Sequence, residues 1–231
     1  AIENAPKVGI EITDFGMEHE PECIKKYYEG CATLADMARK AASMEGVDFL
    51  SFRMEGGDPN GANKSTEELI GELKEIADAV DLPLVVCGCK NVEKDAELFS
   101  KAAEALNGKN AVILSAKEEN YKTVGAAAGL AYKQIVGAES AVDINLAKQL
   151  NVLISQLGVD SKSVVMNVGS AAVGYGFEYV ISTMDRVKAA ALQQGDANLQ
   201  MPIITPVASE AWGVKEAMAS ETDAPEWGSQ E

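Results

Sequence analysis

The sequence has 231 residues, 47% of them hydrophobic, and a formal net charge of −16 at pH 7. A chain of this length can bury the core of one α/β domain, which we expect to occupy residues 1–231 with extended tails at 1–6 and 221–231. The negative charge argues against nucleic acid and anionic membranes as partners, and no apolar run reaches the roughly 18 residues of a membrane span.

Cysteine and histidine usage restricts the chemistry further. The cysteines are Cys23, Cys31, Cys87 and Cys89, and none has the Cys-x-x-Cys spacing of zinc or iron–sulfur sites. We expect Cys87 and Cys89 to share one face of a strand end as reduced, structural thiols. With His19 as the single histidine, no Ser-His-Asp or histidine-cluster site can be assembled. Reduced thiols and the lack of a signal-peptide pattern predict a cytoplasmic protein.

Strand and helix patterns alternate through the first half of the chain. Short apolar runs predict strands at 7–12, 47–52, 84–86 and 111–114. Apolar residues at helical spacing predict helices over 34–41, over 69–80 behind a Ser65–Glu68 capping box, over 98–106 and over 125–130. We expect residues 13–22 to form a polar loop.

The second half repeats the alternation. Strands are expected at 134–136, from Val164 onward and at 201–204, and helices over 146–157, 177–191 and 208–218. Seven strands alternating with seven helices predict a (β/α)8 TIM barrel that lacks its last β-α unit, since typical barrels need about 250 residues. An open doubly wound sheet is the alternative, although no strand–helix junction carries a dinucleotide fingerprint.

The sixth β-α unit has a loop rich in glycine. The predicted strand beginning at Val164 leads into Gly169, Gly174 and Gly176, and a helix follows from Phe177. Ligands bind at the carboxyl ends of parallel strands, where glycine lets backbone N–H groups approach a flat or anionic ligand. Tight turns alone would also explain these glycines.

Polar residues follow most of the predicted strands. If the strands form a barrel, their loops bring amides and carboxylates to one rim, namely Asp58, Asn60, Asn91, Asn120, Asp143, Asn145 and Asn167. Asparagine donates and accepts hydrogen bonds but does not titrate, so this rim favours binding a large polar ligand over acid–base chemistry. The alternative is structural: Asn91, Asn120 and Asp143 stand at helix N-caps, and Asp58-Pro59-Asn60-Gly61 is turn chemistry.

Six short motifs occur in order along the chain: Asp58–Gly61, Asn91–Asp95, Glu119–Lys122, Asp143–Asn151, Gly174–Tyr179 and Glu210–Trp212. Together they resemble the small (delta) subunit of the corrinoid iron–sulfur protein of the CO dehydrogenase/acetyl-CoA synthase complex. The resemblance runs from about Lys7 to Trp227. Members usually continue with a further strand and helix, so we expect this chain to be truncated at its carboxyl end. Some members have an acidic residue and proline where this chain has Asn167-Val168.

The resemblance implies a TIM barrel related to pterin-binding methyltransferases. It implies a heterodimer with a large subunit that carries the iron–sulfur cluster and a corrinoid (cobalamin) domain, leaving no cluster on this chain. The corrinoid would lie over the barrel, take a methyl group from methyltetrahydrofolate or an archaeal pterin through a methyltransferase, and pass it to acetyl-CoA synthase of the Wood–Ljungdahl pathway. The rim residues, the glycine loop and Tyr175 would then contact the corrinoid, with no catalytic residue on this chain.

Two enzymatic alternatives remain open from the sequence. One is a pterin-dependent methyltransferase in its own right, built on the same barrel. The other is an aldolase-like barrel enzyme, which needs a lysine at a strand end. Lys90 and Lys117 are the nearest candidates, and neither lies in an apolar run that would lower its pKa.

Overall fold

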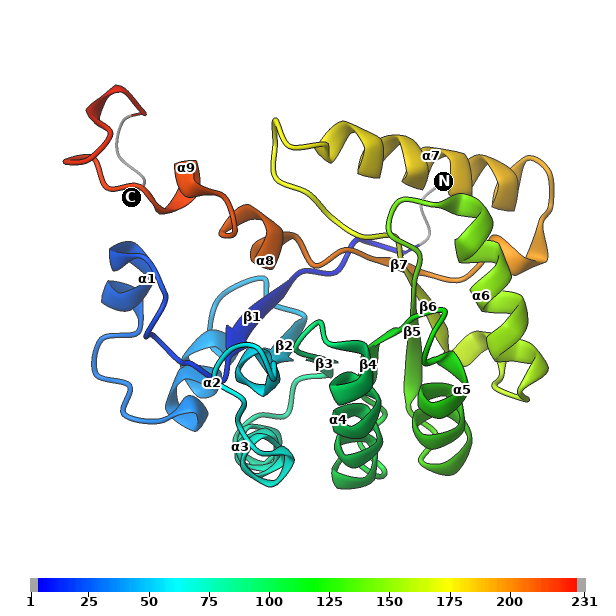
Figure 1. Ribbon diagram of the computed structural model, residues 1–231, viewed down its shortest axis with the longest axis horizontal. Helices are drawn as coiled ribbons and strands as arrows, with labels where there is room; N and C mark the ends of the chain where they lie inside the picture. The colour runs from blue at the N-terminus through cyan, green and yellow to red at the C-terminus, as the bar shows by residue number, and fades with distance from the viewer. Residues whose placement is uncertain (1–3, 228–231) are drawn as a thin grey trace.

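The computed structural model describes residues 4–227. In this part of the chain seven parallel strands form one sheet in the order β1 to β7, so strands adjacent in sequence are adjacent in space (Figure 1). They are β1 (Gly9–Thr13), β2 (Phe49–Arg53), β3 (Leu84–Cys87), β4 (Val112–Ala116), β5 (Ile135–Glu139), β6 (Val164–Asn167) and β7 (Ile203–Ile204). The predicted seven-stranded parallel α/β fold is confirmed, with β1 and β7 at the two edges of the sheet.

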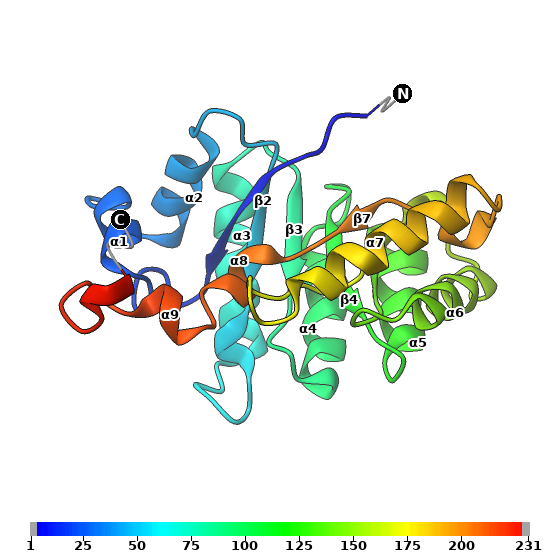
Figure 2. The same cartoon turned by 90° about the horizontal axis from the view of Figure 1, so that it is seen from above.

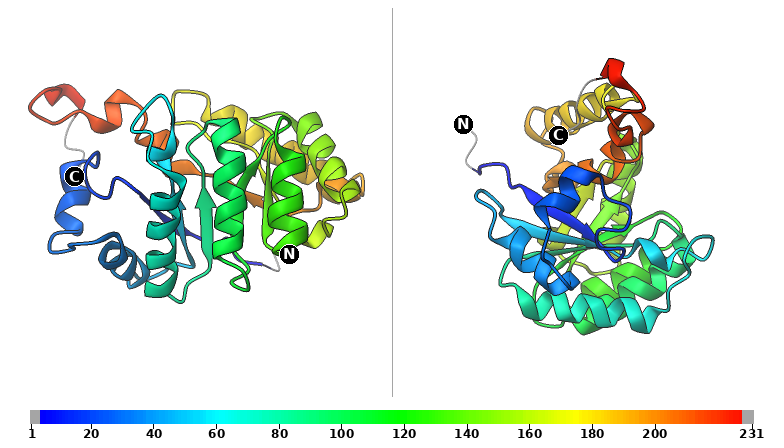
Figure 3. Two further views of the ribbon diagram at one scale, coloured as in Figure 1. Left: turned by 60° about the horizontal axis from the view of Figure 1, so that its bottom comes forward. Right: turned by 90° about the vertical axis from the view of Figure 1, so that its left-hand side faces the viewer.

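Helices in the connections between strands cover the outer side of the curved sheet, and the last two α-helices follow the final strand (Figure 3). Within residues 4–227 they are α1 (Glu22–Tyr27), α2 (Leu34–Ala42), α3 (Thr66–Ala79), α4 (Val92–Ala105), α5 (Tyr121–Val124), α6 (Ile144–Gln156), α7 (Phe177–Leu192), α8 (Val207–Ala211) and α9 (Lys215–Met218). Short 3₁₀ turns lie at 55–57, 161–163, 197–199 and 225–227, and a π-helical segment at 125–131 continues α5.

The main core lies between the sheet and the helices. Leu50 and Phe52 of β2 are fully buried in one cluster with Leu69 of α3 and Leu98 of α4. Because strand side chains alternate, the residues between them point to the other, concave face. The helices therefore cover one face of the sheet, and the concave face is lined by the other set of strand side chains.

Some boundaries differ from the sequence prediction near the amino terminus. The strands predicted to begin at residues 7 and 47 begin at Gly9 and Phe49, and the predicted loop over 13–22 leads directly into α1, which the sequence analysis missed. In α2, Thr33 and Asp36 form a reciprocal capping box that was also missed.

The carboxyl-terminal region differs more. The single helix predicted over 208–218 is two short helices separated around Gly213, and the predicted strand 201–204 shrinks to β7. Neither α8 nor α9 buries a residue, so no packing stabilises a longer helix across the glycine. The tail predicted from residue 221 is not wholly extended, because Ala224 is buried before the 225–227 turn, whereas residues 228–231 lie outside the described part.

Between residues 4 and 227 no helix combines the length and the apolar character that a membrane crossing requires.

Candidate functional site

The concave face of the sheet combines an apolar patch with polar side chains. Val85, Cys87 and Leu114 form a small apolar cluster separate from the main core. Arg53 and Asn167, the last residues of β2 and β6, are only 7% and 3% exposed on the same face. The carboxyl ends of the parallel strands thus form a mouth with buried polar groups.

Glu11 and Arg53 form a bidentate ion pair on this face. Nε and Nη2 of Arg53 lie 3.0 and 2.9 Å from Oε1 and Oε2 of Glu11, and the side chains of Arg53 and Glu11 are 8% and 11% exposed. Arg53 Nη2 also donates to Ser209 Oγ at 3.3 Å, which connects β2 to α8. Burial lowers the pKa of Arg53, but the adjacent Cys87 and Glu11 outweigh it and the net shift is upward. The Arg53 guanidinium therefore stays charged and bound to Glu11.

Asn167 belongs to a second polar group on the concave face. Its Nδ2 donates to Ser115 Oγ at 2.9 Å and to Glu139 Oε2 at 3.4 Å, and its Oδ1 accepts from the Gly169 N–H at 3.0 Å. Glu139 also pairs with Lys117 at 3.3 Å. The predicted placement of Asn167 at the mouth is correct, and its amide is held by the protein itself.

A cavity of about 760 Å³ lies beside β1, between α1 and the α8–α9 segment. Its apolar lining includes Ile24, Tyr27, Tyr28, Met37, Met44, Trp212 and Met218. The acidic, basic and imidazole side chains of its lining are Glu11, His19, Glu20, Arg53, Glu55, Asp58 and Lys90. Burial, followed by the carboxylates of Glu11 and Glu55, raises the pKa of Glu20. Of the predicted rim residues, Asp58 lines this cavity.

Two predicted rim positions cap helices. Asn91 Oδ1 accepts from the Lys94 N–H at 3.0 Å at the start of α4. Asp143 Oδ1 accepts from the N–H groups of Asn145 and Leu146 at 2.7 and 3.1 Å at the start of α6. The N-cap interpretation is confirmed for both residues, while the Asn145 side chain is exposed.

The remaining rim residues form local groups as well. Asp58 Oδ1 accepts from the backbone N–H and Nδ2 of Asn60 at 3.0 and 3.3 Å, which is the predicted turn. Asn120 stands before α5, but the prediction that its side chain caps the helix is wrong. The Asn120 side chain instead accepts from the Lys117 N–H at 2.8 Å and donates to the Val92 carbonyl at 3.3 Å. This joins neighbouring loops and leaves Asn120 5% exposed.

The glycine loop lies at the carboxyl end of β6, as predicted. Gly169, Gly174 and Gly176 have φ values of +85°, +84° and +110°, a conformation that favours glycine. A Cβ at Gly174 would meet nothing within 4 Å, so its surroundings are open. Tyr175 is 57% exposed, and its hydroxyl donates to both carboxylate oxygens of Glu216 at 3.0 and 2.9 Å. Turn geometry alone accounts for these glycines, and the open space leaves room for a ligand.

Comparison with known proteins identifies the family. The model of the family described as CO dehydrogenase/acetyl-CoA synthase delta subunit matches residues 1–223. The chain belongs to this family. The sequence resemblance is thereby confirmed at the level of the delta subunit.

Curated members of the delta-subunit family are similar along most of this chain. Each of three is named acetyl-CoA decarbonylase/synthase complex subunit delta. The protein of Methanothermobacter thermautotrophicus is 33% identical over 215 residues, covering 92% of this chain and 54% of its own length. Those of Methanopyrus kandleri and Methanocaldococcus jannaschii are 36% and 31% identical over 182 and 230 residues, covering 78% and 99% of this chain and 45% and 55% of their own lengths. The chain spans about half the length of these relatives.

Sequence reasoning missed the Glu11–Arg53 pair of this delta-family chain. The available signal was a polar residue at every second position of an otherwise apolar strand, Glu11 in β1 and Ser51 and Arg53 in β2. Lys90 and Lys117, considered for an aldolase-like enzyme, pair with Glu210 at 3.1 Å and Glu139 at 3.3 Å.

The cysteine prediction needs a correction. Cys87 lies in the concave apolar cluster, whereas Cys89 packs in the main core, so the two do not share a face. Strand β3 ends at Cys87, and the Cys89 N–H donates to buried Asp95 at 2.7 Å, so strand alternation stops between them. Burial raises the pKa of Cys87 to about 11 and that of Cys89 to about 12. In the described residues no group of three or more His, Cys, Asp or Glu side chains could hold a metal ion.

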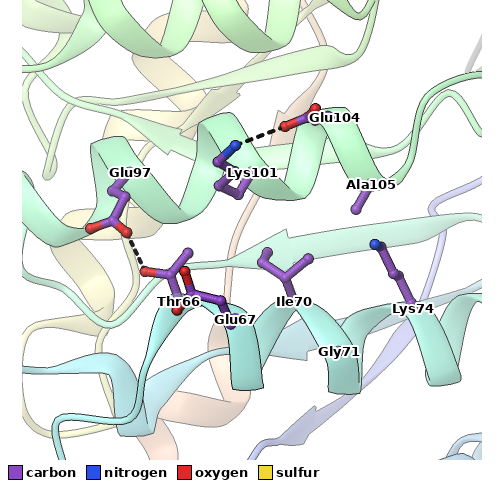
Figure 4. A pocket seen from close by; sticks show the side chains of 9 residues that line it. All are labelled: Thr66, Glu67, Ile70, Gly71, Lys74, Glu97, Lys101, Glu104 and Ala105. Carbon is purple, nitrogen blue, oxygen red and sulfur yellow. Dashed lines mark hydrogen bonds and ion pairs between the residues drawn. The ribbon is translucent and has the colours of Figure 1, made fainter.

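A second hollow of about 580 Å³ runs between α3 and α4 on the helical layer (Figure 4). At one end of the hollow Thr66 of α3 donates to Glu97 of α4. Farther along α4, Lys101 pairs with Glu104 at 3.1 Å. None of the predicted site residues lines it. The mouth at the carboxyl ends of the strands is therefore the better candidate site.

Proposed function

We propose that this chain is a non-catalytic subunit of a corrinoid iron–sulfur methyl carrier. It caps the corrinoid at the mouth of the sheet while a methyl group passes from a methyltetrahydropterin to acetyl-CoA synthase. Membership of the CO dehydrogenase/acetyl-CoA synthase delta subunit family supports this proposal. Its partners would be a large corrinoid iron–sulfur subunit in a heterodimer and, transiently, a methyltransferase and acetyl-CoA synthase.

The proposal of a non-catalytic role rests on the pairing of polar groups with one another at the carboxyl ends of the strands. Arg53 is paired with Glu11, Lys117 with Glu139, and the Asn167 amide with Ser115 and Gly169. General acid–base catalysis needs a group within hydrogen-bond reach of the substrate and able to exchange a proton. Groups committed to one another in this way instead form a rigid polar surface suited to binding.

The residues at the mouth fit a corrinoid chemically. A corrinoid bears amide side chains around a flat ring, and the exposed amides of Asn60 and Asn145 can both donate to and accept from such groups. The open space around Gly174 permits close approach of the ring, and exposed Tyr175 offers an aromatic face. The rest of the corrinoid site at the mouth would be lined by Asp58, Asn91, Asp143, Gly169 and Gly176. The buried and satisfied Asn120 and Asn167 would shape the mouth.

We also propose that the sheet is part of an eight-stranded barrel. The Asp48 N–H donates to the Val8 carbonyl and the Asp14 N–H to the Arg53 carbonyl, so even-numbered residues of β1 face β2. By alternation, backbone groups of Gly9 and Glu11 face the free edge, which proteins normally cover. A longer chain with one more β-α unit should melt at a clearly higher temperature. An equal melting temperature would contradict closure by a further unit.

The corrinoid proposal is tested by crowding the loop. Gly174→Leu in the heterodimer should lower the cobalamin content, measured by visible absorption per heterodimer. Gly108→Leu is the matched control, because Gly108 has the same φ of +84° and equally open surroundings but follows α4, away from the mouth. Both variants carry the same backbone strain, so their melting temperatures should match. Equal cobalamin content in the two variants would remove the loop from the corrinoid site.

The methyltransferase alternative has a separate test. The isolated chain, mixed with methyltetrahydrofolate and free cobalamin, should form no methylcobalamin by its visible spectrum. Turnover that is lost in Asn167→Ala or Asn120→Ala would favour an enzyme over a capping subunit.

A further inference from the structure

Residues 205–218, here called the strap, follow β7 and contain α8 and α9. The strap leaves the carboxyl end of β7 and runs across the molecule toward α1 (Figures 1 and 2). Its two helices bury no residue, and Val207 and Met218 are 45% and 41% exposed. Together with α1 it encloses the 760 Å³ cavity, to which it contributes Trp212 and Met218.

Polar contacts hold the strap over the mouth. Its anchors are Arg53 Nη2 to Ser209 Oγ at 3.3 Å, Lys90 Nζ to Glu210 Oε1 at 3.1 Å, and the Tyr175 hydroxyl to Glu216 at 2.9 Å. Arg53 ends β2, Lys90 follows β3, and Tyr175 follows β6. Because the carboxyl ends of parallel strands share one edge, these contacts span the mouth from one side to the other.

These contacts hold the strap only weakly. Exposed ion pairs contribute little to stability, and both Lys90 and Glu210 are well exposed, at 62% and 38% of their side chains. Segments with few buried apolar contacts open locally without global unfolding. The sheet beneath, by contrast, is held by fully buried residues such as Leu50 and Ile113.

We propose that the strap is a lid, which opens as a unit while the sheet stays folded and so uncovers the cavity and the polar mouth. This inference rests on the proposed function for its purpose, because a corrinoid at the mouth would need the space that the strap occupies. Opening would release Arg53 and Lys90 from their contacts with Ser209 and Glu210, leaving the Glu11–Arg53 pair in place.

Hydrogen exchange of the full chain, followed by mass spectrometry, tests the lid. The variant Ser209→Ala/Glu210→Gln/Glu216→Gln weakens all three anchors from the strap's side, because it removes the Ser209 hydroxyl and the negative charges of Glu210 and Glu216. Glu104→Gln is the control, because it removes the charge of an exposed carboxylate that pairs with Lys101 on α4, away from the strap. In the wild type, peptides from 205–218 should exchange faster than those of β2 and α3. In the triple variant they should exchange at least about threefold faster again, with an unchanged melting temperature.

Other results would overturn the lid. If the strap exchanged hydrogen at the same rate as β2 and α3, it would open only on global unfolding. Acceleration by Glu104→Gln equal to that of the triple variant would show that the anchors are irrelevant.

A second measurement separates the lid from the proposed function. Cobalamin is added to the cobalamin-free heterodimer, and its association rate is followed by visible absorption. The triple variant should bind cobalamin faster than the wild type. Binding at the wild-type rate, with accelerated strap exchange, would show that the strap moves without gating the mouth. No cobalamin binding by any heterodimer would refute the proposed function, and exchange alone would then decide whether the strap opens.

Discussion

The carboxylate of Asp14 holds the backbone of Gly56 at the end of the first two strands. Its Oδ1 and Oδ2 lie 2.9 and 3.2 Å from the Gly56 nitrogen, and the Asp14 side chain is completely buried. Lys64 adds an ion pair at 3.0 Å to Asp14 Oδ2 and a hydrogen bond at 2.9 Å to the Asp14 carbonyl. These contacts position the loop after β2, which brings Asp58 to the cavity.

Removing this anchor should destabilise the protein. In Asp14→Ala the Gly56 N–H and the Lys64 ammonium lose a buried partner, and we expect a loss of about 3 kcal/mol in the free energy of unfolding. Gly56→Ala should also destabilise, because a Cβ there would collide with the Asp14 carboxylate. Urea unfolding measures both effects. A wild-type value for Asp14→Ala would show that the anchor carries no net stability.

Gly71 provides the contrasting glycine. It lies inside α3, on the hollow drawn in Figure 4, and a Cβ there would meet nothing within 4 Å. Alanine has a higher helix propensity than glycine, so Gly71→Ala should raise the free energy of unfolding by about 0.5–1 kcal/mol. The same urea titration measures it, and destabilisation would mean that the hollow must stay open for packing.

Removing the charge of one member of the Glu11–Arg53 pair should destabilise the protein more than replacing both members. Glu11→Gln leaves a buried guanidinium without its counter-charge and should cost about 3–5 kcal/mol in unfolding free energy. The double variant Glu11→Leu/Arg53→Met replaces both charges with apolar groups and should recover most of that loss. A double variant less stable than Glu11→Gln would show that the ion pair is itself stabilising.

The buried thiol of Cys87 should be unreactive in the folded protein. Because burial raises its pKa to about 11, the reactive thiolate is scarce near pH 8. Iodoacetamide at that pH should modify the half-buried Cys23 and Cys31 first, as mass spectrometry of peptides would show. Modification of Cys87 at the rate of Cys31, without unfolding, would contradict this burial.

Glu20 should make stability fall as the pH rises. Burial and the carboxylates of Glu11 and Glu55 raise its pKa, so the folded state keeps this proton to higher pH than the unfolded chain. The resulting stabilisation is present below the ordinary carboxyl pKa and is lost as the pH rises through the raised value. Glu20→Gln, which mimics the protonated acid, should therefore gain stability over the wild type as the pH rises above the ordinary carboxyl pKa. Glu18→Gln, an exposed change in the same loop, is the control in urea unfolding, and an equal gain there would contradict the prediction.

Local sequence patterns predicted the order of the fold and part of the candidate site. Apolar runs and helical spacing predicted seven parallel β-α units, because each element depends on residues a few positions apart. The caps at Asn91 and Asp143 were predictable for the same reason, since a cap bonds a backbone N–H two or three residues away. Chain order then placed their loops at the carboxyl edge of the sheet.

Tertiary structure decided which of these groups meet. The Glu11–Arg53 pair joins residues 42 positions apart, and the Arg53–Ser209 contact joins residues 156 apart. No local pattern encodes such pairings, because they depend on the curvature of the sheet and the register between strands. Asn120 illustrates the same limit: it stands at a helix start, yet the neighbouring Val92 carbonyl and the Lys117 N–H offered its buried amide better partners than the helix did.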